Sequence, residues 1–192
     1  MDRFDRLREQ IDVANGRGLE IGPLASPVVA RELGDVYYVD HLSTDDLIAK
    51  YRNDPNVDER RIVSTDFVWG SNTLAEAVGS AAPFDYVVAS HVLEHVPDLV
   101  GWLKEVATIL RPGGRLIATM IDPILGGVGH AIWWYSEDKQ RGGMKPGERG
   151  GLWNRDVIRM CANAGFRLVR HERFVYGMNN LHVFQAEGAE AK

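Results

Sequence analysis

A strand, a helix and a second strand follow one another directly in the middle of the chain, and no other stretch constrains the fold as strongly. The segment 84–90, FDYVVAS, carries an apolar run that does not alternate with polar residues, which is typical of a strand covered on both faces. The helix predicted at 98–110 has one apolar stripe, and Pro112 ends it before a strand at 115–121. This order predicts two parallel strands joined by a right-handed crossover.

The same alternation extends to both sides of this unit. Further strands are predicted at 19–22, 35–40, 61–67, 166–175 and 181–187. Further helices are predicted at 3–14, 27–33, 43–52, 73–81 and 154–164. The last two strands lie about five residues apart with no helix between them, so they are expected to pair as an antiparallel hairpin. We therefore predict an α/β protein with a Rossmann-like seven-stranded sheet. It is mostly parallel, its last strand is antiparallel, and helices cover both faces.

The length of 192 residues predicts a single domain over 1–192. An N-terminal helical segment is expected within residues 1–16, ahead of the first strand. The glycine-rich stretch 122–151 contains His130 and a cluster of aromatic residues, and it interrupts the pattern of strands and helices. A long loop of this kind inside a compact domain is usually a lid or a binding loop, so we expect it to cover the acceptor.

Composition narrows the possible partners and the compartment. The net charge of −5 argues against nucleic acid, whose binding depends on basic patches. The single cysteine, Cys161, permits no internal disulfide and suits a reducing compartment. The charged N-terminus does not resemble a signal peptide, and no apolar run is long enough for a membrane span. We expect a cytoplasmic protein, and its oligomeric state stays open.

The stretch 17–27, RGLEIGPLASP, predicts a buried strand, a tight turn and the start of a helix. Glu20 lies between two apolar residues, Gly22 ends the strand, and Ser26-Pro27 is a typical helix start. Backbone N–H groups at the start of that helix are expected to hold a polar ligand. The glycine lets such a ligand approach the backbone closely. The alternative is an ordinary strand-to-helix turn with nothing bound.

Ligands of such sheets bind outside the carboxyl ends of the strands, where the strand order reverses. Asp40 lies 18 residues after Gly22 and can accept hydrogen bonds from both hydroxyls of a ribose. Asp66 and Phe67 offer an acceptor and a flat apolar surface for an adenine. His41 either borders the ribose or belongs to a surface loop, and each aspartate is alternatively a turn former. The predicted strand ends bring together Gly22, Asp40, Asp66, Ser90 and His91.

Five segments in this order resemble the class I S-adenosylmethionine-dependent methyltransferases. They are LEIGP (19–23), YVD (38–40), STDF (64–67), FDYVVASHVLEHVPD (84–98) and LRPGGRLI (110–117). The last two are the most specific and are similar to small-molecule methyltransferases related to ubiquinone biosynthesis. The resemblance implies the seven-stranded sheet and S-adenosylmethionine as the methyl donor.

The resemblance, together with the positions of residues at the strand ends, predicts which residues bind the donor. They are Glu20, Gly22, Pro23, Leu24, Asp40, His41, Asp66, Phe67, Ser90 and His91. The chain departs from the G-x-G-x-G pattern of this family, because only Gly22 of the three glycines is present. Pro23 removes one N–H donor from the loop, whereas Ala25 and Ser26 are small enough for close approach. The same departure counts against a nicotinamide dehydrogenase, which depends on G-x-G-x-x-G.

The segment His91-Val-Leu-Glu94-His95 matches the H-x-x-E-H pattern of zinc peptidases. That chemistry requires both histidines one turn apart on a helix, with a third ligand elsewhere. Here the segment follows a strand directly, and Pro97-Asp98 begins the helix only afterwards. We interpret the histidines as loop residues, and a zinc hydrolase is kept as the less favoured alternative.

The resulting hypothesis is methyl transfer to a small molecule, sugar or lipid held under the 122–151 loop. The acceptor must be aligned with the methyl carbon, and such positioning supplies about 7–11 kcal/mol of barrier lowering. A general base gives only about 10²–10⁴-fold, so catalysis does not require an obvious one. His95 and His130 are the candidate bases. The alternative from another class is a non-catalytic binding protein, which the altered glycine motif favours.

Overall fold

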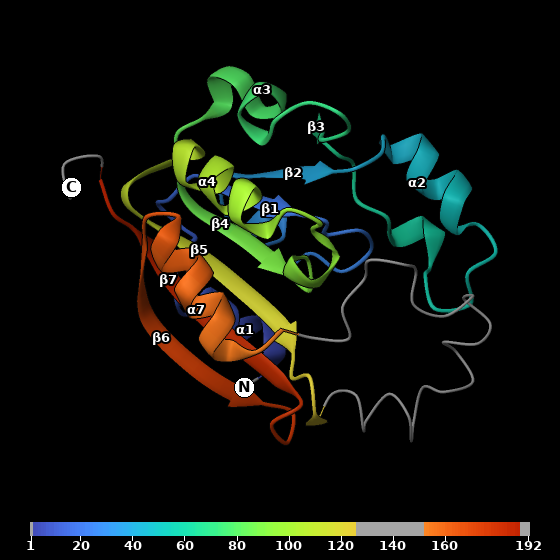
Figure 1. Cartoon of the computed structure of the whole chain (residues 1–192). Coiled ribbons are helices and arrows are strands. Elements are labelled where there is room, and N and C mark those ends of the chain that lie inside the picture. Colours follow the sequence, from blue (N-terminus) through green and yellow to red (C-terminus); the bar gives the residue numbers. More distant parts are fainter. Residues whose placement is uncertain (1, 126–151, 189–192) are drawn as a thin grey trace.

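The computed structural model describes residues 2–125 and 152–188, and all of its strands belong to one sheet (Figure 1). The strands are β1 (Gly18–Ile21), β2 (Val36–Asp40), β3 (Phe67–Val68), β4 (Phe84–Ser90), β5 (Leu110–Ile121), β6 (Phe166–Phe174) and β7 (Asn179–Ala186). They lie in the order β3-β2-β1-β4-β5-β7-β6. The first five are parallel neighbours, and β7 is antiparallel to both β5 and β6. The predicted mostly parallel sheet with an antiparallel last strand is confirmed.

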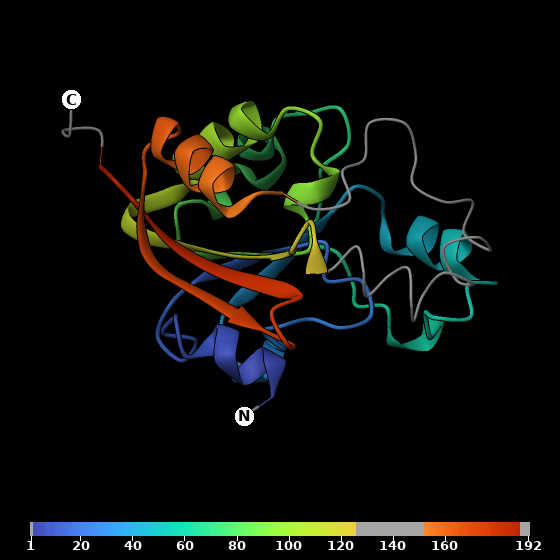
Figure 2. The same ribbon diagram turned by 60° about the horizontal axis from the view of Figure 1, so that its bottom comes forward.

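Helices cover both faces of this sheet, as predicted. The α-helices are α1 (Arg3–Arg8), α2 (Thr44–Tyr51), α3 (Leu74–Val78), α4 (Leu99–Ile109) and α7 (Asn154–Asn163). Single 3₁₀ turns are η1 (Arg31–Leu33), η2 (Glu59–Arg61), η3 (Gly79–Ala81) and η4 (Leu93–His95). Figure 2 shows α1 on one face and α3, α4 and α7 on the other. The short α2 lies beyond the end of β2 (Figure 1).

The core consists of two apolar layers, one on each face of the sheet. The apolar stripe of α4 is buried and includes Trp102 and Leu103. It packs on the layer that contains Val87 from β4, whereas Tyr86 and Val88 belong to the opposite layer with α1. The unalternating apolar run of β4 is therefore buried on both faces, and each such side chain contributes about 1.5–3 kcal/mol on burial.

Two predicted elements are shorter than expected. The helix predicted at 27–33 is wrong, because only the 3₁₀ turn η1 forms there. The strand predicted at 61–67 is nearly absent, since only Phe67–Val68 pairs with β2. At the second place the Asp66 carboxylate accepts from the Tyr38 N–H that a longer β3 would bind, as described below for the candidate site.

Several boundaries also differ from the prediction. The N-terminal helix ends at Arg8 rather than near residue 14. The last helix begins at Asn154 as predicted, and the Asn154 Nδ2 donates to Asn180 Oδ1 (3.0 Å). The predicted lid or acceptor loop, 122–151, lies outside the described residues apart from 122–125. Among the helices in the described ranges, none is long and apolar enough to cross a membrane.

Candidate donor-binding site

The strand order reverses between β1 and β4, and the candidate site lies at the carboxyl ends of these strands. Ile21 pairs with Ala89, so the next residues, Gly22 and Ser90, flank this switch point. Asp40 ends the neighbouring strand β2. Ligands of open α/β sheets bind in the crevice at such a point.

Glu20 anchors the loop that follows β1. The residue is only 1% exposed, and its carboxylate accepts hydrogen bonds from the backbone N–H groups of Val28 (2.7 Å) and Val29 (2.9 Å). Burial raises the pKa of this carboxyl to about 7, although both hydrogen bonds act in the opposite direction. These two N–H groups are therefore not available to a ligand, and the predicted helix-start site is wrong.

The remaining part of the loop has a backbone suited to a polar ligand. Gly22 has φ +65° and Leu24 has φ 47°, so both adopt the left-handed conformation. The N–H of Gly22 donates to Val39 O (2.9 Å). The N–H groups of Leu24 and Ala25 have no acceptor in residues 2–125 and 152–188. Two backbone donors thus remain for a polar ligand despite Pro23.

Asp40 is held by its neighbours at the end of β2. Its Oδ1 accepts from the backbone N–H of His41 (2.7 Å) and contacts His41 Nδ1 (2.5 Å). The other ring nitrogen, Nε2, lies 2.8 Å from Lys50 Nζ on α2. The carboxylate is 5% exposed, and its Oδ2 makes no hydrogen bond to the described part of the chain. His41 and Lys50 therefore fix the orientation of Asp40 and leave one oxygen open.

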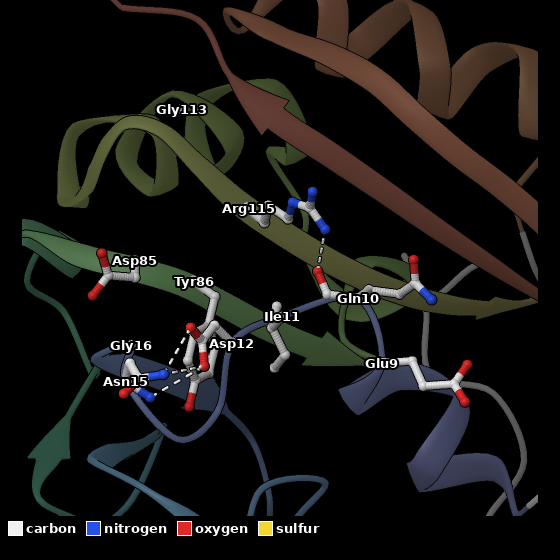
Figure 3. Close-up of a pocket in the computed structure, with 10 residues that line it drawn as sticks. All are labelled: Glu9, Gln10, Ile11, Asp12, Asn15, Gly16, Asp85, Tyr86, Gly113 and Arg115. Atoms are coloured by element: carbon white, nitrogen blue, oxygen red, sulfur yellow. Dashed lines mark hydrogen bonds between the residues drawn. The ribbon is translucent and has the colours of Figure 1, made fainter.

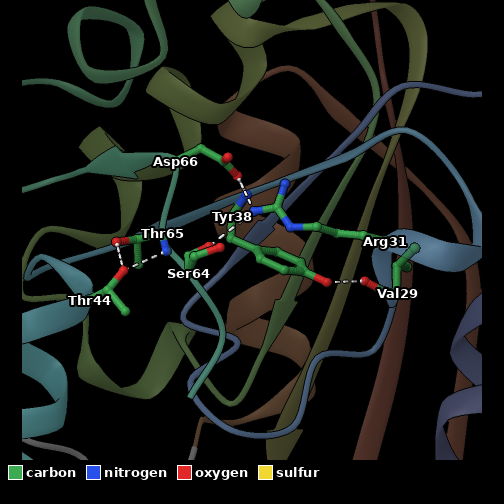
Figure 4. A network of polar contacts seen from close by, with 7 residues as sticks. All are labelled: Val29, Arg31, Tyr38, Thr44, Ser64, Thr65 and Asp66. Atoms are coloured by element: carbon green, nitrogen blue, oxygen red, sulfur yellow. Dashed lines mark hydrogen bonds and ion pairs between the residues drawn. The ribbon is translucent and has the colours of Figure 1, made fainter. Parts of the chain in front are cut away.

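Asp66 and Phe67 lie beside β2, as Figure 4 shows for Asp66. The Asp66 carboxylate accepts from the backbone N–H of Tyr38 and from Arg31, each at 2.7 Å through Oδ2. The side chain thus takes a place in the sheet that a backbone carbonyl of a longer β3 would occupy. Phe67 stacks on Tyr37 with ring centroids 5.7 Å apart.

A polar chain crosses from the end of β4 to the N-terminal helix. Ser90 Oγ lies 2.9 Å from Thr119 Oγ1 on β5 and accepts from Arg3 Nη2 of α1 (2.7 Å). Partial burial lowers the pKa of the Arg3 guanidinium. The sequence analysis missed Arg3, Arg31 and Lys50. No local pattern marks Arg3 or Arg31, whereas Lys50 is identifiable from its position on the helix directly after His41.

The H-x-x-E-H segment forms a tight turn and not a zinc-binding helix. His91 has φ 57°, and only Leu93–His95 form a 3₁₀ turn. Glu94 is buried, and its Oε1 accepts from the N–H of Ile121 (2.8 Å) and lies 3.6 Å from His91 Nδ1. Asp98 caps the following helix, α4. In the described ranges, no group of three or more histidine, cysteine or acidic residues is placed to hold a metal.

Of the two candidate bases, only His95 lies within the described residues. His95 lies on η4 and is exposed at the carboxyl edge of the sheet. His130 lies outside the described residues, so its role stays a prediction.

A cavity of about 630 Å³ lies at the opposite edge of the sheet (Figure 3). Asp85, Tyr86, Gly113 and Arg115 line it from the early parts of β4 and β5, together with the loop after α1. Arg115 Nη1 closes one side by donating to Gln10 O (2.5 Å). Since ligands of this fold bind at the carboxyl ends, this cavity is not the candidate site.

The sheet order, the switch-point loop and the acid at the end of β2 together define a class I S-adenosylmethionine-dependent methyltransferase. A family model described as "Methyltransferase domain" matches residues 1–171, and the chain belongs to this family. S-adenosylmethionine is therefore its cofactor.

Known proteins agree with this assignment. The chain is 30% identical over 129 residues to a ubiquinone biosynthesis O-methyltransferase of Xylella fastidiosa strain M23, covering 64% of this chain and 49% of that protein. The chain thus spans about half the length, or less, of the curated relatives it matches.

Solved structures share the fold. A methyltransferase from Mesorhizobium loti aligns with a TM-score of 0.63 at 16% identity, over 94% of this chain and 96% of that one. The N-methyltransferase NodS from Bradyrhizobium japonicum, solved with S-adenosylhomocysteine, aligns with a TM-score of 0.56 at 16% identity, over 96% and 85%.

Proposed function

We propose that the protein transfers the methyl group of S-adenosylmethionine to a small-molecule acceptor at the carboxyl edge of the sheet. The observation that carries this proposal is the meeting of three groups at the switch point. They are the open N–H groups after Gly22, the available Asp40 oxygen and the end of β4. In this proposal the loop binds the methionine part, Asp40 the ribose, and Asp66 with Phe67 the adenine.

The protein contributes mainly binding and alignment to the reaction. The donor supplies a methyl group already activated by its sulfonium charge. Glu20, Pro23, Leu24 and His41 shape the donor site, and Ser90 with His91 border the methyl end. His95 and His130 are the proposed bases that take a proton from the acceptor.

The acceptor is proposed to be a sugar or lipid-like molecule with a hydroxyl group. The O-methyltransferase names of the curated relatives favour oxygen as the methylated atom. Exposed apolar side chains also gather after β5 and around the β6–β7 turn. They are Ile124 (57% exposed), Leu125 (40%), Val175 (43%) and Tyr176 (98%). Such a surface suits the apolar part of an acceptor.

A transfer assay tests this function. Donor carrying a labelled methyl group is incubated with the protein and with separate pools of phenols, sugars and lipids. The expected result is label in one small-molecule pool. The Asp40→Ala variant should lose this transfer, whereas Asp45→Ala, an exposed acid on α2, should keep it. Donor binding without transfer to any pool would support a non-catalytic binding protein and contradict the proposal.

A further inference from the structure

Arg31 joins two parts of the candidate site (Figure 4). One is the loop after β1, residues 22–30, called the donor loop below, and the other is the segment 64–67, predicted to recognise adenine and called the adenine segment. Arg31 begins the 3₁₀ turn η1, directly after the loop. Its Nη2 donates to Asp66 Oδ2 (2.7 Å) and to Ser64 O (3.0 Å). Its guanidinium carbon lies 4.5 Å from the centroid of the Tyr38 ring. One side chain thus contacts three residues in two other segments of the chain.

Asp66 is fixed through a single oxygen. Oδ2 accepts from both Arg31 and the Tyr38 N–H, while the Asp66 N–H donates to Tyr38 O (2.8 Å). Oδ1 makes no hydrogen bond to residues 2–125 and 152–188. A charged donor and a backbone donor on the same oxygen restrict the rotation of the carboxylate and hold the other oxygen in place.

Two further hydrogen bonds tie the loop to its neighbours, one to the residue before the adenine segment and one to β2. Val63 N–H donates to Leu24 O (2.9 Å), and the Tyr38 hydroxyl donates to Val29 O (2.7 Å). Arg31 therefore holds Asp66 within a framework that also contains the donor loop.

We propose that Arg31 is a positioning residue for the donor's adenine, because it holds Asp66 so that Oδ1 accepts from the exocyclic amino group. This inference rests on the proposed function, in which Asp66 is the adenine acceptor. A carboxylate in a fixed place favours an amino group and disfavours a carbonyl oxygen, since it has no proton to donate. Arg31 thereby determines how strongly the site distinguishes adenine from hypoxanthine.

Calorimetric titration with two ligands tests this role. S-adenosylhomocysteine carries the amino group, and S-inosylhomocysteine carries a carbonyl oxygen in its place. The wild-type protein should prefer the first ligand at least about tenfold, since a lost or opposed hydrogen bond to a charged group has an effect of this order. The Arg31→Met variant should lose most of this preference.

Two further variants accompany the measurement. Arg60→Met breaks a similar ion pair, between Arg60 and Asp58. The Arg60 side chain is 85% exposed, and this variant should leave the ligand preference unchanged. Asp66→Asn keeps an acceptor for the Tyr38 N–H and adds a donor, so its preference should shift toward S-inosylhomocysteine. Because partly exposed ion pairs contribute little to stability, Arg31→Met is expected to fold.

The outcomes separate this inference from the proposed function. If the wild-type protein binds neither ligand, the proposed function fails, and the inference fails with it. If the wild type prefers S-adenosylhomocysteine and Arg31→Met weakens both ligands by the same factor, only the positioning role is overturned. An unchanged preference in Asp66→Asn would likewise overturn it.

Discussion

At the scale of single residues, Glu20 links the core to the donor loop. It sits in the middle of the sheet, yet its carboxylate reaches two backbone N–H groups eight and nine residues later. Ionised oxygens accept such bonds strongly, and a buried N–H left without an acceptor costs about 1–3 kcal/mol. The residue therefore fixes the loop at its far end while Gly22 shapes the near end.

The Glu20→Gln variant should bind the donor at least about tenfold more weakly. A carboxamide offers one oxygen and places an NH₂ group against a backbone N–H, so one loop anchor is lost. Calorimetric titration with S-adenosylmethionine measures the effect. Glu105→Gln is the matched control, because Glu105 accepts from the Leu74 N–H (2.6 Å) away from the loop. Equal donor affinities in the two variants would contradict this role for Glu20.

Sequence reasoning at this scale succeeded where a residue ends a strand. Gly22, Asp40 and Ser90 could be placed together because the carboxyl ends of parallel strands meet at one edge. Arg3 could not be placed, since its contact with Ser90 spans 87 residues and depends on how α1 packs. Arg31 reaches Asp66 across 35 residues for a similar reason.

At the scale of elements, the β6–β7 hairpin contains a buried histidine without a hydrogen-bond partner. His182 is 0% exposed, and neither ring nitrogen bonds to the described residues. Its ring stacks between those of His171 (4.5 Å) and Phe184 (5.7 Å). Burial, with a smaller contribution from His171, lowers the pKa of His182 from its usual 6.5 to about 3.

The buried His182 of this hairpin should lower the stability of the protein at acidic pH. Between about pH 3 and 6.5 the unfolded chain binds a proton at His182 that the folded chain does not bind. The stability from the neutral ring is thus complete above pH 6.5 and is lost as the pH falls, by about 1.4 kcal/mol per unit. Urea unfolding is measured from pH 7.5 to 4. As the pH falls, the free energy of unfolding of His182→Phe should increase relative to that of the wild type. A constant difference across this range would contradict the account.

Element boundaries were predicted best where apolar periodicity decided them. The helix α4 and strand β4 were placed within one or two residues, because each buries a continuous stripe or run. The segment 61–67 has the composition of a strand, but the Asp66 carboxylate takes the Tyr38 N–H that a longer β3 would need. That competition is not visible in local propensity. At 27–33 only the turn η1 forms, although Ser26-Pro27 is a typical helix start.

At the scale of the whole molecule, two buried groups oppose each other in their pH dependence. The pKa of Glu20 is raised from 4.5 to about 7, so its stability contribution is complete below pH 4.5 and is lost as the pH rises through 7. His182 has the opposite dependence between about pH 3 and 6.5. The two effects should nearly cancel between pH 4.5 and 6.5.

Separating the two groups should expose each dependence. In His182→Phe, the free energy of unfolding should fall relative to the double variant with Glu20→Gln as the pH rises from 4.5 to 7. In Glu20→Gln, it should rise relative to the same double variant as the pH rises from 4 to 6.5. Denaturant titrations at half-unit pH intervals measure both slopes. Parallel curves for all variants would show that neither group titrates differently on folding.

The proposed function concerns one edge of the sheet, the edge at the carboxyl ends of the parallel strands. Six strands run toward or beside that edge, and α1, η1 and α2 each contribute a side chain to it through Arg3, Arg31 and Lys50. The family match shows that the chain is a methyltransferase, whereas Arg3, Arg31 and Lys50 are features of this particular chain.

Donor binding is the most direct test of the central claim. Purified protein is titrated calorimetrically with S-adenosylmethionine and S-adenosylhomocysteine, beside Asp40→Ala and the control Asp45→Ala. We expect micromolar binding of both ligands, unchanged in the control and weakened at least about tenfold in Asp40→Ala, since a charged hydrogen bond is lost. No binding by the wild type, or equal binding by Asp40→Ala, would contradict a donor site at this edge of the sheet.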